Sequence, residues 1–587
     1  MKTSFGFELK IISLFWLVFY PLLSTNLVRA QNTLPSQPET IPRDIPPALP
    51  PQPETAEPET LPPIEEILPE IETTPQDLPP TIEGVPDAVF VRKFEIVGST
   101  VFTSEELAEV LEPYTMRRLS FTELLAAQQA IDRLYIENGY ITSGTFLPPQ
   151  KLQDGIVTIE VIEGTVQQIN IEGLDRLNPG YVRSRLEIAT GAPLNQDELL
   201  NALQILQLDP LIETLAAELT AGTGIGSSIL EISLQEADPF DLTLGFDNYR
   251  TPSVGTDRRQ VRLTHRNLVG FGDRFTLGYL NTDGSDSLND LNYTIPLNAY
   301  NGTLNFRFSY TDSEIIEEPF DEFDIASENT NYEFTYRQPL LQKPTEDIAI
   351  GLTFSRNESQ TTLGGEPIQL GGAETDGETH ISALRFFQEY TNRDANQVFA
   401  LRSQFSLGVN LFDATINEGD RPDSKFLAWR GQVQYLRLLS PDITLLLRSD
   451  LQFSDRFLVS VEKFSLGGAL SVRGYRQDAL LGDNGWFNSA EIRATILRIP
   501  DWETSVQLSP FLDFGKVWNT DKFDNANNIE LDFAKNTLVS IGVGLRLQVS
   551  DVFAARLDYG IPLVDLETEG DSLQEDGIYF SLELKPF

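Results

Sequence analysis

The feature that most constrains the fold is an alternation of apolar and polar residues that recurs from about residue 240 to the C-terminus. Every second residue is apolar in Phe240–Phe246, Leu304–Tyr310, Ile348–Phe354 and Val539–Leu547. A period of two predicts β-strands that have one apolar and one polar face. A soluble β-sandwich shows the same alternation, so the pattern by itself leaves open whether the apolar face points inward or outward.

The N-terminus bears on that choice, because residues 1–30 have the composition of a secretory signal peptide. Lys2 and Lys10 supply positive charge around the apolar run Ile11–Leu23. An uncleaved anchor helix is the alternative, but thirteen residues interrupted by Pro21 are short for a membrane span. Since no later apolar run is long enough to span a bilayer as a helix, a chain of this kind would enter a membrane as a barrel.

We therefore predict a transmembrane β-barrel of antiparallel strands over residues 238–587, with its apolar face toward lipid. The long polar connections Thr311–Asn329 and Gly364–Thr379 agree with this fold, and Phe587 is the candidate C-terminal assembly signal. At roughly 20–24 residues per strand and connection, the segment holds about 16 strands. A barrel of that width encloses an aqueous lumen, which some part of the chain must obstruct.

Composition excludes several classes of function. The 587 residues include 43 Lys+Arg and 87 Asp+Glu, and the net charge of −44 argues against a nucleic-acid partner. The chain has no cysteine and two histidines, which leaves no basis for disulfides, thiolate chemistry or a His-rich metal site. We expect that the protein is not an enzyme and that it binds no cofactor and no metal. The acidic profile, together with the proline-rich segment described next, is compatible with a cyanobacterial outer membrane.

Residues 31–88 differ in composition from the rest of the chain. They hold 16 prolines between Pro35 and Pro86, twelve acids and a single base, Arg43. This composition predicts an extended, disordered spacer, and a PxxP docking ligand is the alternative.

Two units with the same predicted order of elements, β-α-α-β-β, follow at residues 89–164 and 165–237. The first begins with a predicted strand at Phe90–Gly98, and capping boxes at Thr103/Glu106 and Ser120/Glu123 predict the starts of its two helices. In the second unit Asn195 and Glu198 have the same spacing before a helix. Such a repeat indicates two copies of one α+β module.

The modules resemble the POTRA domain, the periplasmic module of outer-membrane assembly and secretion barrels. Tyr135, Tyr140, Leu147–Gly155 and Val161–Gly164 carry a more specific likeness to two-partner secretion transporters (TpsB), the ShlB/FhaC/HecB haemolysin secretion/activation family. The resemblance implies substrate binding in the periplasm. Candidate contact residues are Tyr135, Tyr140, Gln150, Gly155 and Gly164, and we expect the strand Ile156–Gly164 to offer an exposed edge for β-augmentation.

A glycine-rich segment near residues 464–486 contains Ser471–Tyr475, which reads SVRGY. Taken alone, its arginine has the character of a solvated turn residue. The segment resembles the V-R-G-Y signature of the POTRA-barrel superfamily, whose loop folds into the barrel, and Phe511–Gly515 resembles the F-x-D-x-G element of a late strand. The resemblance implies a luminal latch in which Arg473 pairs with Asp513. The residues assigned to this loop and strand are Gly467, Gly468, Val472, Gly474, Tyr475, Phe511 and Gly515.

Physical chemistry agrees with that assignment. A guanidinium gives a carboxylate two parallel donors, so it sets orientation as well as position. The alternation places Asp513 toward the lumen, with Leu512 and Phe514 toward lipid. We expect Gly474 to permit a tight turn, and Gly467 and Gly468 to let the loop approach the wall. In a wet lumen the pair would contribute about 1 kcal/mol, which suits a contact that can be re-made.

The expected function is that of an outer-membrane transporter in a Gram-negative bacterium. It would capture an unfolded exoprotein, a TpsA-like adhesin or haemolysin, through its POTRA modules and translocate it through the barrel. Other expected partners are outer-membrane lipid, lipopolysaccharide and, during biogenesis, the barrel-assembly machinery. An outer-membrane assembly insertase of the same superfamily is the alternative, and a passive porin is a third.

Overall fold

The structure is a computed structural model that describes residues 88–151, 154–419, 421–520, 536–566 and 570–586. The predictions for the signal peptide, for the linker up to residue 87 and for Phe587 lie outside these residues. Within the described part of the chain, no helix has the length and apolar character needed to cross a membrane.

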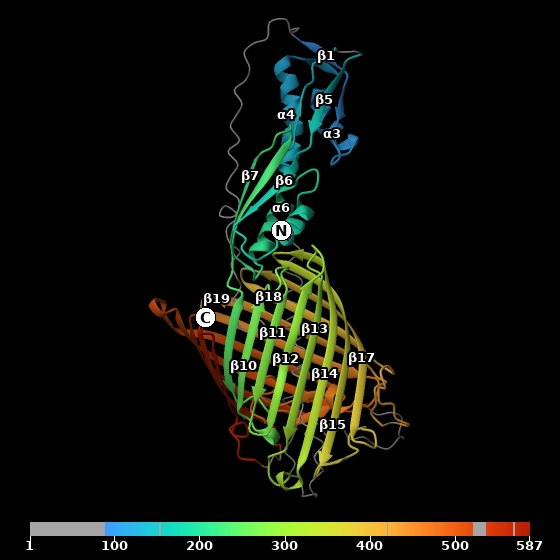
Figure 1. Ribbon diagram of the computed structural model, residues 1–587. Helices are drawn as coiled ribbons and strands as arrows, with labels where there is room; N and C mark the ends of the chain where they lie inside the picture. The colour runs from blue at the N-terminus through green and yellow to red at the C-terminus, as the bar shows by residue number, and fades with distance from the viewer. Residues whose placement is uncertain (1–87, 152–153, 420, 521–535, 567–569, 587) are drawn as a thin grey trace, which may run out of the picture. The chain divides into compact units, whose positions relative to one another are not determined.

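The first module is an α+β unit (Figure 1). Its sheet has the order β2-β5-β4, with β2 parallel and β4 antiparallel to β5. Both helices begin with the predicted capping boxes, in which each N-cap side chain and its Glu bond reciprocally. The elements are β1 (Val89–Val91), β2 (Lys93–Val97), α3 (Ser104–Leu111), β3 (Arg117–Leu119), α4 (Phe121–Glu137), β4 (Gly144–Phe146) and β5 (Ile156–Ile162).

Two predictions for this module are wrong. The single strand expected at 90–98 is divided at Arg92 into β1 and β2, because β1 pairs with β3 in a separate sheet while β2 pairs with β5. At the division the amides of Arg92 and Lys93 both donate to the carbonyl of Gly155. The expected exposed edge at β5 is also absent, since β5 is the central strand of its sheet.

The second module repeats the β-α-α-β-β order. Its sheet runs β6-β8-β7, so β6 and β7 are the edge strands. Asn195 caps the second helix by accepting from the amides of Asp197 and Glu198. Its core is a cluster of leucines, isoleucines and valines from both helices and all three strands. The elements are β6 (Thr165–Glu172), α5 (Pro179–Ala189), α6 (Gln196–Gln207), β7 (Ile212–Ala221) and β8 (Ser227–Glu236).

The strands from β9 onward, except β21 and β22, close into an antiparallel barrel (Figure 1). Closure is made by the pairing of β27 with β9. Sixteen strands build the wall, as predicted, and β16 (Glu366–Pro367) only extends the end of β15. The wall strands are β9 (Phe240–Asp247), β10 (Arg258–Arg266), β11 (Arg274–Asn281), β12 (Ser285–Pro296), β13 (Thr303–Glu314), β14 (Ile325–Lys343), β15 (Glu346–Leu363), β17 (Glu378–Asp394), β18 (Gln397–Val409), β19 (Leu427–Ser440), β20 (Ile443–Ser454), β23 (Asn484–Ile499), β24 (Thr504–Trp518), β25 (Thr537–Val549), β26 (Phe553–Pro562) and β27 (Ile578–Leu584).

The two faces of the wall have the predicted character. On β25 the apolar Ile541, Val543 and Leu545 are exposed on the outside, whereas Ser540 is buried on the inside. Connections at one end of the barrel are short, such as residues 441–442, and those at the other end are long, such as residues 410–426. Within the described residues, the short 3₁₀ helices are η2 (Glu112–Tyr114), η3 (Pro252–Val254), η4 (Asp321–Phe323), η5 (Ser460–Glu462) and η6 (Pro500–Trp502).

Candidate functional site: the inward loop and its luminal anchor

One connection of the barrel folds into the lumen. Strand β20 pairs directly with β23, so residues 455–483, here named the inward loop, leave the wall without interrupting it. The loop forms a small hairpin of β21 (Phe464–Leu466) and β22 (Leu480–Gly482). It packs on the inner faces of β23, β24 and β25 through an apolar cluster of buried residues. The cluster comprises Phe464, Leu466, Val472, Tyr475, Phe487, Val517 and Leu538.

Glycines determine how closely the tip of the loop approaches the wall. Gly474 has φ +95°, and a Cβ there would lie 3.1 Å from the carbonyl carbon of Gly560 on β26. At Gly515 on β24, a Cβ would lie 2.7 Å from Leu466 and 2.8 Å from Val472 of the loop. Gly474 and Gly515 are therefore two of the positions where loop and wall meet without room for a side chain.

Gly467 and Gly468 have a different role from the one predicted. Both have positive φ, at +106° and +93°. A Cβ on Gly467 would meet the carbonyl of Arg476, and one on Gly468 would meet Gln477, so their close neighbours belong to the inward loop itself. They shape the hairpin and do not bring it against the wall.

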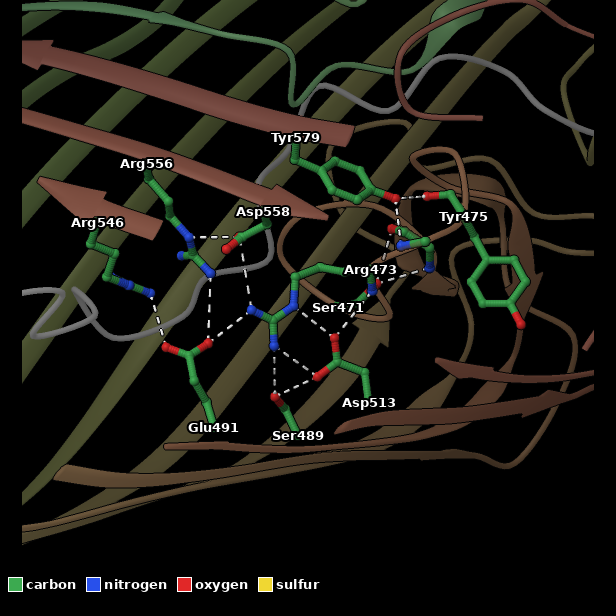
Figure 2. A network of polar contacts seen from close by, with 12 residues as sticks. Ser471, Arg473, Tyr475, Ser489, Glu491, Asp513, Arg546, Arg556, Asp558 and Tyr579 are labelled. Atoms are coloured by element: carbon green, nitrogen blue, oxygen red, sulfur yellow. Dashed lines mark hydrogen bonds and ion pairs between the residues drawn. The ribbon is translucent and has the colours of Figure 1, made fainter. Parts of the chain in front are cut away.

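The predicted pair between Arg473 and Asp513 is confirmed (Figure 2). Nε and Nη2 of Arg473 donate to the two carboxylate oxygens of Asp513 at 2.7 and 3.0 Å, and the amide of Arg473 donates to the same group at 3.2 Å. The guanidinium carbon lies 3.3 Å from the centre of the Phe511 ring, a cation–π contact. Asp513 and Phe511 both face the lumen, as the alternation predicts.

The environment of this pair differs from the expected wet lumen. Arg473 and Asp513 are each 0% exposed, and Arg473 is the largest fully buried side chain in the described part of the chain. Charges without contact to water are costly unless each is compensated, and removing one partner of such a pair typically costs about 3–5 kcal/mol. The contact is therefore a buried ion pair, and the expected value of about 1 kcal/mol for an exposed pair does not apply to it.

Sequence reasoning missed two further carboxylates around Arg473. Its Nη1 donates to Glu491 on β23 at 2.8 Å and lies 3.8 Å from Asp558 on β26. The alternation along their strands places Glu491 and Asp558 on the luminal face, as it does the other polar residues of those strands. Only the folded loop shows that both carboxylates lie close to Arg473. Figure 2 shows this convergence.

The added carboxylates have arginine partners of their own. Arg546 donates to Glu491 at 3.1 Å, and Arg493 donates to it at 2.8 Å. Arg556 forms an ion pair with Asp558 at 2.6 Å. Glu491 and Asp558 therefore keep cationic partners on the wall even when Arg473 is displaced.

Two tyrosine hydroxyls join the loop to the rest of the barrel, each through main-chain groups on the other side of the contact. The hydroxyl of Tyr579 on β27 accepts from the amide of Gly474 at 2.8 Å and donates to the carbonyl of Tyr475 at 2.5 Å (Figure 2). The hydroxyl of Tyr475 lies 2.8 Å from the carbonyl of Val539 and 2.9 Å from that of Val564. Tyr579, which was not predicted, is 0% exposed and links the loop tip to the last strand.

The inward loop also has contacts away from its tip. Glu462 accepts two hydrogen bonds from Arg385 on β17, at 2.5 and 3.0 Å. Arg476 pairs with Glu317, in the connection between β13 and β14, at 2.7 Å, and with Glu575, in the connection between β26 and β27, at 3.2 Å. The loop is thus attached to several separate parts of the barrel, consistent with an obstruction of the lumen.

The candidate substrate contacts of the first module occupy structural positions. Tyr135 is fully buried and stacks edge-on with Tyr140 at 5.9 Å, so the prediction that it contacts substrate is wrong. Gln150 is exposed, and its amide group bonds the main chain of Thr158 on β5. Gly155 has φ +71°, and Gly164 donates to Ser143. For Tyr140, Gln150, Gly155 and Gly164, substrate contact stays a prediction.

The hydroxyl of Tyr135 belongs to a polar cluster around Glu163. Glu163 accepts from the amides of Thr100 and Val101, from the hydroxyl of Thr100 and from the hydroxyl of Tyr135, at 2.5–3.2 Å. Partial burial works to raise the pKa of Glu163, but these hydrogen bonds outweigh it and hold the pKa below its usual value. Burial raises the pKa of Tyr135 to about 12, so this hydroxyl stays a donor at neutral pH.

Comparison with known proteins places this architecture among described families. Residues 226–547 match the family model described as haemolysin secretion/activation protein ShlB/FhaC/HecB, and residues 89–164 match the POTRA domain, ShlB-type. The outer membrane transporter CdiB of Escherichia coli O6:K15:H31 (strain 536 / UPEC) is 26% identical over 500 residues, covering 81% of this chain and 79% of the relative. The heme/hemopexin transporter protein HuxB of Haemophilus influenzae (strain 86-028NP) is 22% identical over 480 residues, covering 78% and 81%.

Solved structures share the fold. CdiB from Escherichia coli superposes with a TM-score of 0.67 at 22% identity, covering 87% of this chain and 93% of that chain. BamA from Haemophilus ducreyi lacking POTRA domains 1–3 has a TM-score of 0.51 at 16% identity, covering 84% and 100%.

Proposed function

Because the chain belongs to the haemolysin secretion/activation protein family ShlB/FhaC/HecB, and is thus an outer-membrane transporter with POTRA domains in the periplasm, we propose that it captures an unfolded exoprotein and passes it through its barrel to the cell surface. The passenger is of the adhesin or haemolysin class, and displacement of the inward loop opens the route. The transporter carries out no chemical reaction of its own.

The observation that supports this proposal most directly is the way the inward loop is held. A loop that served only to stabilise the barrel could be buried against the wall by apolar contacts alone. Here ionic and hydrogen-bonded groups hold the tip in addition to the apolar cluster, and the carboxylates around Arg473 have additional arginines beside them. Such an arrangement can exchange partners, which apolar packing of the same area does not favour.

Capture is assigned to the edge strands of the second module. Strands β6 and β7, of 8 and 10 residues, each have one neighbour in their sheet, so each has a row of main-chain groups available for an added strand. Pairing through the main chain would hold a passenger with little dependence on its side chains. The free energy for transport would come from folding of the passenger outside the cell.

Biogenesis and membrane contacts complete the proposal. We expect the barrel-assembly machinery to insert the chain, and the exposed apolar face of the wall, such as Ile541, Val543 and Leu545, to contact outer-membrane lipid and lipopolysaccharide.

Deletion of the gene, followed by quantitative analysis of the medium and of the outer membrane, tests the proposal. We expect one large secreted protein to disappear from the medium and to return on complementation with the wild-type gene, while other outer-membrane barrels keep their levels. Unchanged secretion contradicts the proposal. A general fall in outer-membrane barrels would instead indicate an assembly insertase, and a large, steady conductance of the wild-type protein in planar bilayers would indicate a porin.

A further inference from the structure

The connection between β18 and β19, residues 410–426, exposes two large apolar side chains. Leu411 is 48% exposed and Phe412 is 68% exposed. An exposed apolar group of this size beside a larger apolar surface marks a place where the protein contacts something other than water. The position of the Phe412 ring shows which surface that is.

Phe412 lies against the outer face of the barrel. Its ring contacts the ring of Phe354 edge-on, with 5.6 Å between the centroids. Phe354 lies on β15, on the same outward face as the exposed Leu352. Its cross-strand partner on β17 is Leu384. Because β18 follows β17 around the wall, Phe412 must reach across the outside of β17 to touch Phe354.

The outward residues of β15 show how high on the barrel this contact lies. Going toward the end with long connections, they are apolar through Phe354 and become charged at Arg356 and Glu358. Such a change of polarity marks the upper edge of the hydrocarbon layer, where barrels carry a ring of aromatic residues. Phe412 therefore lies at the boundary between the acyl chains and the headgroups.

The backbone holds the segment in this place. The hydroxyl of Ser382 on β17 donates to the carbonyl of Leu411 at 2.9 Å, and Thr415 exchanges two hydrogen bonds with the main chain of His380 at 2.8 and 2.9 Å. Phe412 and Asp413 have φ +56° and +55°, a left-handed conformation that non-glycine residues rarely adopt. Two consecutive residues in that conformation, one of them bulky, indicate a segment whose shape serves a contact.

We propose that Leu411–Asp413 is a membrane anchor that places Phe412 in the interfacial region of the outer leaflet, where it contacts lipid acyl chains. The occupant of this surface is lipid because Phe412 continues the lipid-facing wall at Phe354. The anchor fixes the depth of the β15–β17–β18 part of the wall in the membrane.

The absence of cysteine from the chain allows a direct test with single spin labels. We would make Phe412→Cys, Leu407→Cys and Phe323→Cys, attach a nitroxide, and reconstitute each protein in vesicles of phosphatidylethanolamine and phosphatidylglycerol. Leu407 is 50% exposed on β18 and serves as the reference in lipid; Phe323 is 53% exposed on η4 and serves as the reference in water. Phe323 lies next to Ile325, which pairs with Leu363 on β15. Leu363 is nine residues beyond Phe354 on that strand, so for a tilted strand Phe323 lies roughly 20 Å farther than Phe354 toward the end with long connections.

The measured quantity is the ratio of collision rates with oxygen, which concentrates in lipid, and with a neutral nickel chelate, which stays in water. We expect the ratio at position 412 to be within twofold of that at 407 and several-fold above that at 323. A ratio equal to that at 323 overturns the proposal. Shielding of the label from both reagents also overturns it and would point to a protein partner. If Phe412→Cys fails to fold, Leu411→Cys is measured with the same outcomes.

Discussion

Asp513 accepts hydrogen bonds from Nε, Nη2 and the main-chain amide of Arg473, and neither side chain has any exposure to solvent. The donors thus fix both the guanidinium plane and the main chain of the loop tip. An exposed ion pair would hold the loop only weakly, whereas this one makes the docked loop sensitive to a single substitution on either side.

Substitution of either partner should impair secretion without preventing barrel assembly. Arg473→Ala leaves the carboxylate of Asp513 buried without its cationic partner, whereas Glu491 keeps Arg493 and Arg546, and the change should weaken loop docking by about 3–5 kcal/mol. Asp513→Ala should have a smaller effect, because Arg473 keeps Glu491 at 2.8 Å. Secretion and heat-modifiable electrophoretic mobility are the measurements. Arg307→Ala, which removes a luminal arginine paired with Asp290 on another part of the wall, is the matched control. Normal secretion by both variants would show that the pair is no latch.

The second arginine at Asp558 should govern how readily the loop is released. In the wild type Arg556 pairs with Asp558 at 2.6 Å, so Asp558 keeps a cation when Arg473 leaves. In Arg556→Gln, Arg473 is the cation that remains near Asp558, so release of the loop leaves Asp558 without one and the docked state is favoured. We expect the open fraction in planar bilayers to fall about tenfold, on the order of 1.4 kcal/mol. Adding Asp558→Asn to this variant removes the charge that needs compensation and should restore opening. A defect that persists in the double variant would assign Arg556 a purely structural role.

Gly474→Ala should loosen the loop for a steric reason. The alanine would have to adopt φ +95°, at a conformational cost of about 1–2 kcal/mol, and its Cβ would lie 3.1 Å from the carbonyl carbon of Gly560. Gly364→Ala is the control, since that glycine has φ +60° but open space within 4 Å of where its Cβ would lie. We expect more frequent channel openings for Gly474→Ala and wild-type behaviour for Gly364→Ala. Equal effects of the two would mean that contact with β26 is unimportant.

The first module should lose stability in acid through Glu163. Its folded-state pKa lies below the usual value, so its contribution is present above that usual value and is lost as pH falls through the lowered pKa. Allowing for its partial exposure, the contribution is about 1 kcal/mol. Hydrogen exchange of α4 and β5 in the full-length protein is the measurement. Glu163→Gln should increase exchange at neutral pH and reduce the change on acidification, whereas Glu160→Gln, an exposed position on β5, should match wild type. A wild-type pH profile for Glu163→Gln contradicts this.

Local sequence patterns were sufficient to predict the helices and strands and one contact between residues distant in sequence, Arg473 and Asp513. Alternation predicts the strands and their inner and outer faces, because side chains on a strand point to opposite sides. The capping boxes at Thr103 and Ser120 predict where α3 and α4 begin, because both partners lie within one turn. The contact between Arg473 and Asp513 followed from two motifs that resemble a known family.

What the patterns could not provide depends on the closed barrel. Glu491, Asp558 and Tyr579 lie on three different strands, and only closure of the wall around the loop brings them to Arg473 and Gly474. The burial of Arg473 has the same origin, since neighbouring residues say nothing about how completely a loop fills a lumen. The division of the strand at Arg92 depends on β3, which is distant in sequence and too short to show a pattern.

The direct pairing of β20 with β23 separates two kinds of motion. Ten residue pairs join these strands, so the inward loop can leave the lumen while every main-chain hydrogen bond of the wall stays in place. Unfastening the loop and unfolding the barrel are then distinct cooperative events with their own free energies. The wall can be very stable while the loop opens on the timescale that transport requires, and mutations can adjust one without the other.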